Sequence, residues 1–371
     1  MKHHWIAMFI LLVPALACNL VQSAPVTAPT QAPLPENGNR PPATASVPAE
    51  VPAAEIPPLY FFYAIHTHVQ GDWLPYESPP MLRLDTRAAD NMLLAITAIQ
   101  QVLDRYGAKG TWEVVYGTAK GLCTYQGQNH IFRQLEAAGH EIAVHAHRTE
   151  DIGRAAENLR TDCGMNPQTT SGFIAEVSKA GTGGAQEAMI EAIEVSLANG
   201  LTVGTENLSP GGGKNPFAEL CANQFGVGND MWRESGNLMF PWRPDYPNGN
   251  ICADNPQAQL VFVDHVSIEW LTLAGGGMPD VVGDAQFDAL RQMFDAALAY
   301  MEQNRPQQVA AWGFVTHITE YAPGSKAENP PDPQVLAALD RFMAYVAQKA
   351  AEGRVIFATA GEIARSVVPM P

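Results

Sequence analysis

The chain has 371 residues, of which 46% are hydrophobic and 16% are charged, and its formal net charge is −16. The hydrophobic fraction is normal for a globular protein and excludes a largely disordered chain. The acidic balance, without any block of basic residues, argues against a nucleic-acid partner and against electrostatic binding to anionic lipid.

The first eighteen residues have the pattern of an export signal. Lys2 precedes an apolar run over residues 5–17, which is too short to span a bilayer as a helix. The run ends in ALAC, which resembles the lipobox of bacterial lipoproteins, with Cys18 as the lipidated residue. We expect residues 1–18 to be a lipoprotein signal that anchors the protein outside a bacterial membrane. An ordinary cleaved signal would leave the protein secreted.

Residues 19–58 contain ten prolines and no apolar periodicity. Such a segment cannot bury enough surface to offset the entropy of ordering it. We expect a disordered, extended tether that holds the following domain away from the membrane.

Four cysteines follow the tether, at positions 123, 163, 221 and 252. An even number in an exported chain favours disulfides, and four cysteines allow three pairings. We favour the pairs nearest in sequence, Cys123–Cys163 and Cys221–Cys252, over free buried thiols. Because no CxxC spacing occurs, we do not assign these cysteines to a metal site.

Residues 59–371 alternate between strand and helix patterns. We predict strands at 59–68, 110–117, 140–147, 171–175, 201–206, 259–264, 309–317 and 354–360. We predict helices at 87–107, 131–139, 185–200, 284–303 and 332–351, followed by a closing helix. An irregular insertion occupies about 207–257. This alternation predicts one α/β domain, a nearly closed (β/α) barrel of seven or eight parallel strands.

Five histidines fall at the C-terminal ends of predicted strands, where α/β barrels place their active sites: His66, His68, His145, His147 and His317. Four of them form two His-x-His pairs. Because strand side chains alternate between faces, the two members of each pair point the same way. Neutral imidazole suits Zn²⁺, so we predict a divalent metal, zinc, held by His66, His68 and His145, with His147 as a further ligand.

Two acidic residues are candidate partners of this site. Asp72 follows the first histidine pair, and Glu113 lies within a predicted strand. A carboxylate inside a barrel is costly unless it is paired or bound to a metal. Glu113 would then be a general base or a ligand. The alternatives are a turn role for Asp72 and a solvent-exposed edge position for Glu113. His265 follows a strand and could line the cleft.

Several segments resemble polysaccharide deacetylases of the NodB-homology type. They are YGAKGTWEVVYG, IFRQLEAAGHEIAVHAHRTEDIG, WGFVTH and the closing VIFATAGEIARSV. The resemblance covers most of 59–367 apart from the insertion, and it implies the NodB-like barrel and metal-dependent deacetylation. It also implies that His317 is the general acid that protonates the leaving group.

The chain departs from the family pattern at two motifs. The family's TFDDG is replaced by AIHTHVQGD, and Thr149 stands where the second metal histidine is usual. The histidine-rich first strand is similar to those of alpha-mannosidase and family 57 amylase barrels. The resemblance therefore implies the fold, with a different set of metal ligands.

The leading hypothesis is an extracytoplasmic, metal-dependent hydrolase that deacetylates a glycan of the polysaccharide or peptidoglycan type, with Asp72 or Glu113 as base. One alternative is a glycoside hydrolase that uses two of four carboxylates, Glu113, Glu206, Asp264 and Glu320. A second alternative is a tethered glycan-binding lipoprotein without catalytic activity. We expect a monomer that contacts the membrane only through its lipid.

Overall fold

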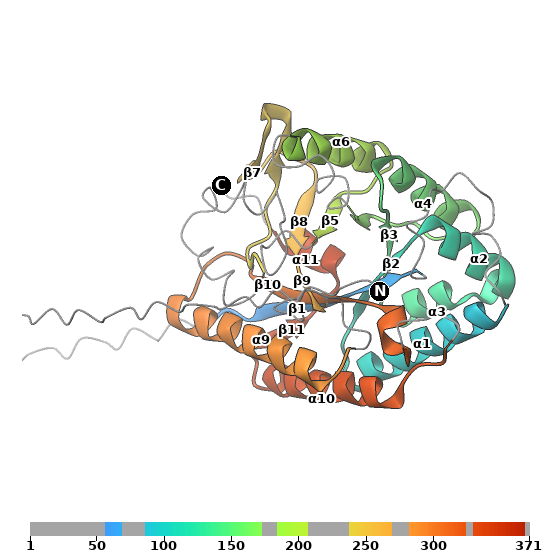
Figure 1. The fold of residues 1–371 in the computed structure, drawn as a ribbon. Helices are drawn as coiled ribbons and strands as arrows, with labels where there is room; N and C mark the ends of the chain where they lie inside the picture. Colours follow the sequence, from blue (N-terminus) through green and yellow to red (C-terminus); the bar gives the residue numbers. More distant parts are fainter. Residues whose placement is uncertain are drawn as a thin grey trace, which may run out of the picture. The chain divides into compact units, whose positions relative to one another are not determined.

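Parallel strands form the centre of the fold in the computed structural model, and helices lie around them (Figure 1). The structure describes residues 56–68, 86–172, 184–206, 237–268, 282–323 and 329–367. All of these residues lie in one compact unit, Ala54–Pro371. The predicted signal, nearly all of the tether, Cys18 and Asp72 lie outside the described residues and stay predictions.

One sheet contains all but two of the described strands, and every strand pair in it is parallel. Its strands are β1 (Leu59–Thr67), β2 (Gly110–Val114), β3 (Glu141–His145), β4 (Thr169–Ser171), β5 (Val203–Glu206), β8 (Val261–Asp264), β9 (Val266–Ser267), β10 (Ala311–His317) and β11 (Val355–Phe357). The other two, β6 (Pro244–Asp245) and β7 (Asn250–Asp254), form an antiparallel pair within the predicted insertion.

The sheet curves into a barrel because its two edges belong to one stretch of chain. The strand order is β8-β5-β4-β3-β2-β1-β10-β9, and β11 pairs with the start of β1. Only His265 separates β8 from β9, so residues 261–267 pair with β5 at one end and with β10 at the other. The predicted α/β barrel of seven or eight parallel strands is confirmed.

The described helices are α1 (Thr86–Arg105), α2 (Tyr116–Gln126), α3 (Ile131–Ala137), α4 (Thr149–Thr161), α6 (Ala185–Ala198), α9 (Asp284–Asn304), α10 (Pro333–Ala351) and α11 (Ala360–Ser366). Three short 3-10 helices are η2 (Gly127–Asn129), η4 (Tyr246–Asn248) and η6 (Ile318–Tyr321). The predicted stripe of α1, with Met92, Ile96 and Ile99, is buried against the strands. No described helix has both the length and the apolar character that crossing a bilayer requires.

Apolar side chains fill the barrel interior at the N-terminal ends of the strands. Phe62 and Ala64 of β1 pack there with residues of the neighbouring strands and with Ile363 of α11. The carboxylate of Glu141 accepts the backbone N–H of Gly361 at 3.0 Å, near the start of α11. Helix α11 therefore closes this end of the barrel, and the opposite end is left to polar side chains.

Several elements differ from the sequence prediction, which lacks the short strands β6, β7 and β9 as well as two of the helices. Helix α2 begins where we predict the end of a strand, because burial of Ala119 and Leu122 outweighs the low helix propensity of its glycines. Helix α4 is also missing from the prediction, although it buries an apolar stripe. The fourth strand ends at Ser171 rather than beginning there. Gly172 follows at φ 104°, where a Cβ atom would lie 1.4 Å from the carbonyl oxygen of Ala146.

A disulfide joins Cys123 in α2 to Cys163, which follows α4. This is one of the two bonds that we expect. Cys252 is also disulfide-bonded, and its partner lies outside the described residues, so the Cys221–Cys252 pairing stays a prediction.

Replacing both Cys123 and Cys163 by serine is expected to lower the free energy of unfolding by about 4 kcal/mol, because the bond closes a long loop in the unfolded chain. The two residues are 40 positions apart. Urea unfolding of the oxidised wild type and of the double variant measures the difference. Equal midpoints at equal slopes would show that this bond adds nothing to stability.

Candidate metal centre

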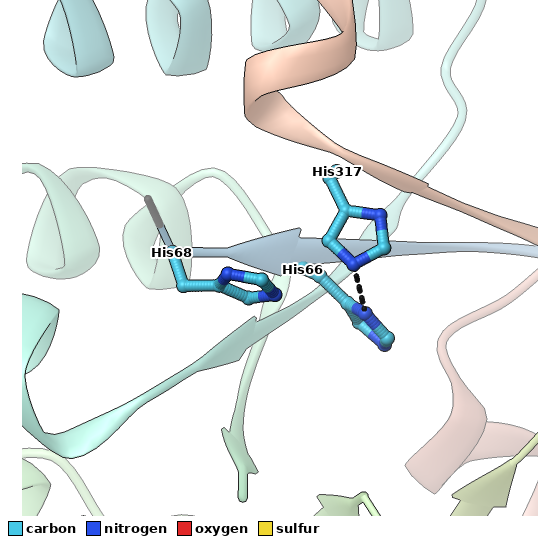
Figure 2. A group of neighbouring side chains, drawn as sticks. All are labelled: His66, His68 and His317. Atoms are coloured by element: carbon cyan, nitrogen blue, oxygen red, sulfur yellow. Dashed lines mark hydrogen bonds between the residues drawn. The ribbon is translucent and has the colours of Figure 1, made fainter. Parts of the chain in front are cut away.

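Six histidines and one glutamate converge at the C-terminal ends of the barrel strands. They are His66 and His68 at the end of β1, Glu113 in β2, His145 and His147 at the end of β3, His265 between β8 and β9, and His317 at the end of β10. Strand register explains the convergence, because His66 is the Cα partner of both His317 and Glu113. Figure 2 shows the imidazoles of His66, His68 and His317 around the end of β1.

A chain of polar contacts crosses the cluster from β5 to η6. The Thr205 hydroxyl donates to Glu113, whose Oε2 lies 2.8 Å from His66 Nε2. The other ring nitrogen of His66, Nδ1, lies 3.2 Å from His317 Nε2 (Figure 2). His317 Nδ1 lies 3.3 Å from Glu320 Oε1, and its backbone N–H donates to Glu320 Oε2 at 2.8 Å. Each ring is thereby held in one orientation.

The second histidine pair forms the other side of the cluster. His145 Nδ1 lies 2.7 Å from the Ser171 hydroxyl, and His145 Nε2 lies 2.9 Å from His147 Nε2. The ring of His68 lies 5.2 Å from that of His145 and 4.9 Å from that of His147, measured between centroids. The nitrogens of three imidazoles therefore face one small volume.

Burial keeps the imidazoles of His66, His145 and His265 neutral. It lowers the pKa of His66 and of His145 well below the ordinary value, and the neighbouring imidazoles lower both pKa values further. For His66 these effects outweigh the adjacent Glu113 carboxylate. Burial lowers the pKa of His265 to about 3. Neutral imidazole is the form that binds metal ions, so these three histidines are in the ligand form at neutral pH.

The cluster fits a divalent metal. Three groups of residues offer ligand atoms that all lie within 4.8 Å of one another: His68, His145 and His147; His66, His68 and His317; and His66, Glu113 and His265. The ligand atoms of a tetrahedral zinc ion lie about 3.4 Å apart, so modest side-chain shifts would complete a site. Imidazole nitrogens with a carboxylate oxygen are the ligands that zinc and similar ions prefer.

The structure brings together the predicted residues that it describes. His66, His68, His145, His147 and His317 lie in one cluster. Glu113 is fully buried inside the barrel, so the alternative of a solvent-exposed edge position is wrong.

Two members of the site have other roles in the sequence prediction, which places His265 along the cleft and Glu320 among the candidate carboxylates of a glycoside hydrolase, and assigns neither to the metal site. His265 is only 2% exposed, and neither of its ring nitrogens has a hydrogen-bond partner among the described residues. Its position two residues after Val263 indicates which face of the strand the His265 side chain lies on, whereas its place in the cluster depends on how residues 261–267 pair at the two edges of the sheet. Glu320 contacts His317, and the three-residue spacing between them at a strand end was the available signal.

The four carboxylates of the glycoside hydrolase alternative have different surroundings. Glu113 and Glu320 each contact a cluster histidine. Asp264 instead accepts the backbone N–H of Leu238 at 2.6 Å. The side chain of Glu206 lies outside the described residues.

Two buried histidines outside the cluster have structural roles. His130 Nδ1 accepts the backbone N–H of Arg133 at the start of α3, and His140 Nδ1 accepts that of Gly110. Burial lowers the pKa of both. Each can be replaced without touching the cluster, so they provide matched controls.

Because buried histidines in this protein have lowered pKa values, we expect the free energy of unfolding to fall in acid. In the unfolded chain each imidazole binds a proton near pH 6.5, whereas the lowered pKa values keep the folded ones neutral. Below that pH the unfolded state binds more protons, so the free energy of unfolding is highest above about pH 6.5 and falls as the pH decreases. Thermal unfolding of metal-free protein between pH 8 and pH 5 measures this. A melting temperature that stays constant or rises towards pH 5 would refute it.

Comparison with solved structures shows which known fold this chain resembles. No protein-family model and no curated protein matches the chain. A structure from Pseudomonas aeruginosa PAO1, described as a probable polysaccharide deacetylase, matches with a TM-score of 0.50 at 12% identity, over 83% of this chain and 90% of that one. A structure described as a polysaccharide deacetylase from Mycobacterium smegmatis has a TM-score of 0.48 and a sequence identity of 16%, over 85% of this chain and 92% of that one. The PuuE allantoinase structure has a TM-score of 0.49 and an identity of 14%, over 83% of this chain and 89% of that one. The Pseudomonas match confirms the fold expected from the sequence resemblance, and identities this low show the fold alone.

Proposed function

We propose that the protein is a metal-dependent hydrolase that removes acetyl groups from a glycan. The observation that carries the proposal is the cluster of six histidines and Glu113 in the mouth of the barrel. The similarity of the fold to a polysaccharide deacetylase structure supports the substrate class.

The metal ligands are three histidines whose nitrogens face one volume, His68, His145 and His147. A zinc ion held by these residues would supply a Lewis acid for an acyl carbonyl and for a water molecule. The ligand geometry depends on neighbouring groups, since the Ser171 hydroxyl fixes the ring of His145 from the side opposite to His147.

The other groups of the site move protons. Asp72 or Glu113 takes the proton of the attacking water. His317 protonates the leaving sugar oxygen or nitrogen, and Glu320, at 3.3 Å from Nδ1, holds its ring in one tautomer. Glu320 is thus a positioning residue.

Acetate release tests this function against its alternatives. The full chain, treated with chelator and reloaded with Zn²⁺, is incubated with acetylated xylan and with N-acetylglucosamine oligomers. We expect acetate from at least one of them, none after chelation alone, and no new reducing ends. New reducing ends without acetate would identify a glycoside hydrolase, and glycan binding without either product would identify a binding module.

We also propose that the chain is exported and anchored through Cys18, because the ALAC motif follows an apolar signal. Labelling with a fatty acid in a bacterial host is expected for the wild type and not for Cys18→Ser. Equal labelling of both chains would refute the anchor.

A further inference from the structure

The cluster offers more ligands than one metal ion can use. Six imidazoles and one carboxylate lie together, whereas a zinc ion takes about four ligands. A single-ion centre would therefore use only part of this set of ligand atoms.

Two of the three ligand groups have no residue in common. We name His68, His145 and His147 the upper group, and His66, Glu113 and His265 the lower group. The third group takes one residue from each of them, together with His317. The upper and lower groups can therefore be filled at the same time, whereas an ion in the third group would compete with both.

We propose that the protein binds two divalent cations, one in the upper group and one in the lower group. The upper ion would have three nitrogen ligands. The lower ion would have two nitrogens and the Glu113 carboxylate. The inference deepens the proposed function and rests on it.

The lower group has the two features of a cation site. Glu113 is fully buried, and its Oε2 lies 2.8 Å from His66 Nε2. His265 is buried beside them, with neither ring nitrogen hydrogen-bonded among the described residues. A buried carboxylate next to imidazoles is stabilised by a cation that all of them coordinate.

The two groups are close enough for one dinuclear centre. The rings of His66 in the lower group and His145 in the upper group lie 3.9 Å apart between centroids. In two-metal hydrolases the ions lie about 3.5–4 Å apart and hold the attacking and leaving oxygens together. The ring of His317 lies 4.7 Å from His66 and 4.8 Å from His68, so the proposed acid is next to both groups.

The second ion changes the role of Glu113. As a ligand of the lower ion Glu113 would not be free to be the base. Glu113→Gln is therefore expected to lose an ion and not merely to lose activity.

Metal stoichiometry tests the proposal. Samples of the metal-free full chain are titrated with Co²⁺ or with Zn²⁺. After equilibration and desalting, the number of ions bound per chain is counted by mass spectrometry. We expect two ions in the wild type and in the control His140→Gln. We expect one ion in His147→Ala, in His265→Gln and in Glu113→Gln, and at most one, in the remaining group of His66, His68 and His317, when His147 and His265 are both replaced. Near-UV circular dichroism selects the variants that keep the native fold.

Each outcome decides between the models. Two ions in the wild type and one in the folded variants of either group support the dinuclear centre. One ion in a wild type that releases acetate overturns the second ion and leaves the proposed function standing. No bound ion and no acetate overturn both, and two ions retained in His265→Gln and Glu113→Gln overturn the lower site.

Discussion

Replacing both His66 and His145 by alanine is expected to abolish acetate release, with a fall in kcat/KM of about 10³-fold or more. The two residues belong to different ligand groups, and their rings lie 3.9 Å apart. The double variant therefore weakens every metal position in the cluster. A catalytic metal ion supplies several kcal/mol of transition-state stabilisation in metal-dependent hydrolases, and each 1.36 kcal/mol corresponds to a factor of ten in rate.

His130→Asn is the matched control for this variant. It removes a buried imidazole at the start of α3, and asparagine retains the ability to cap the helix. We expect the control to keep its metal and its activity. Acetate release that survives in the folded His66→Ala/His145→Ala protein would refute the assignment of the cluster as the active site.

Replacing His317 by glutamine is expected to lower kcat by about 10²–10⁴-fold on a glycan substrate, because the variant cannot protonate the leaving group. His317 lies between β10 and η6 and contacts His66 and Glu320 without belonging to the upper or lower group. The metal content is therefore expected to stay unchanged. We expect the wild type to lose activity at high pH, where a general acid loses its proton, and we expect His317→Gln to lack this fall.

An aryl acetate separates the acid role from a structural one. A phenolate with electron-withdrawing substituents leaves without a proton, so the deficit of His317→Gln is expected to shrink greatly on this substrate. Glu320→Gln keeps the imidazole and is expected to show a smaller loss on the glycan. Equal deficits of His317→Gln on both substrates would contradict the acid assignment.

The sequence predicts much of this site because strand periodicity is a local property. The apolar alternation in β1 and β3 indicates that His66 and His68 share a face, and likewise His145 and His147. A strand-end position then places both pairs at one end of a parallel barrel. These two local rules are enough to identify most of the cluster.

What the sequence cannot predict depends on pairing between distant segments. The contact of Glu113 with His66 follows from the register of β1 with β2, and that of His317 with His66 from the register with β10. His265 enters the cluster because residues 261–267 join the two edges of the sheet. No pattern within one strand specifies which residue of another strand will lie opposite.

The most direct test is an anomalous difference map from crystals of the zinc-loaded protein, recorded on both sides of the zinc absorption edge. We predict an edge-dependent peak bounded by the imidazoles of His68, His145 and His147, and a second one beside Glu113. A map without a peak in the cluster, with the imidazoles hydrogen-bonded to one another instead, would contradict the assignment of a metal centre.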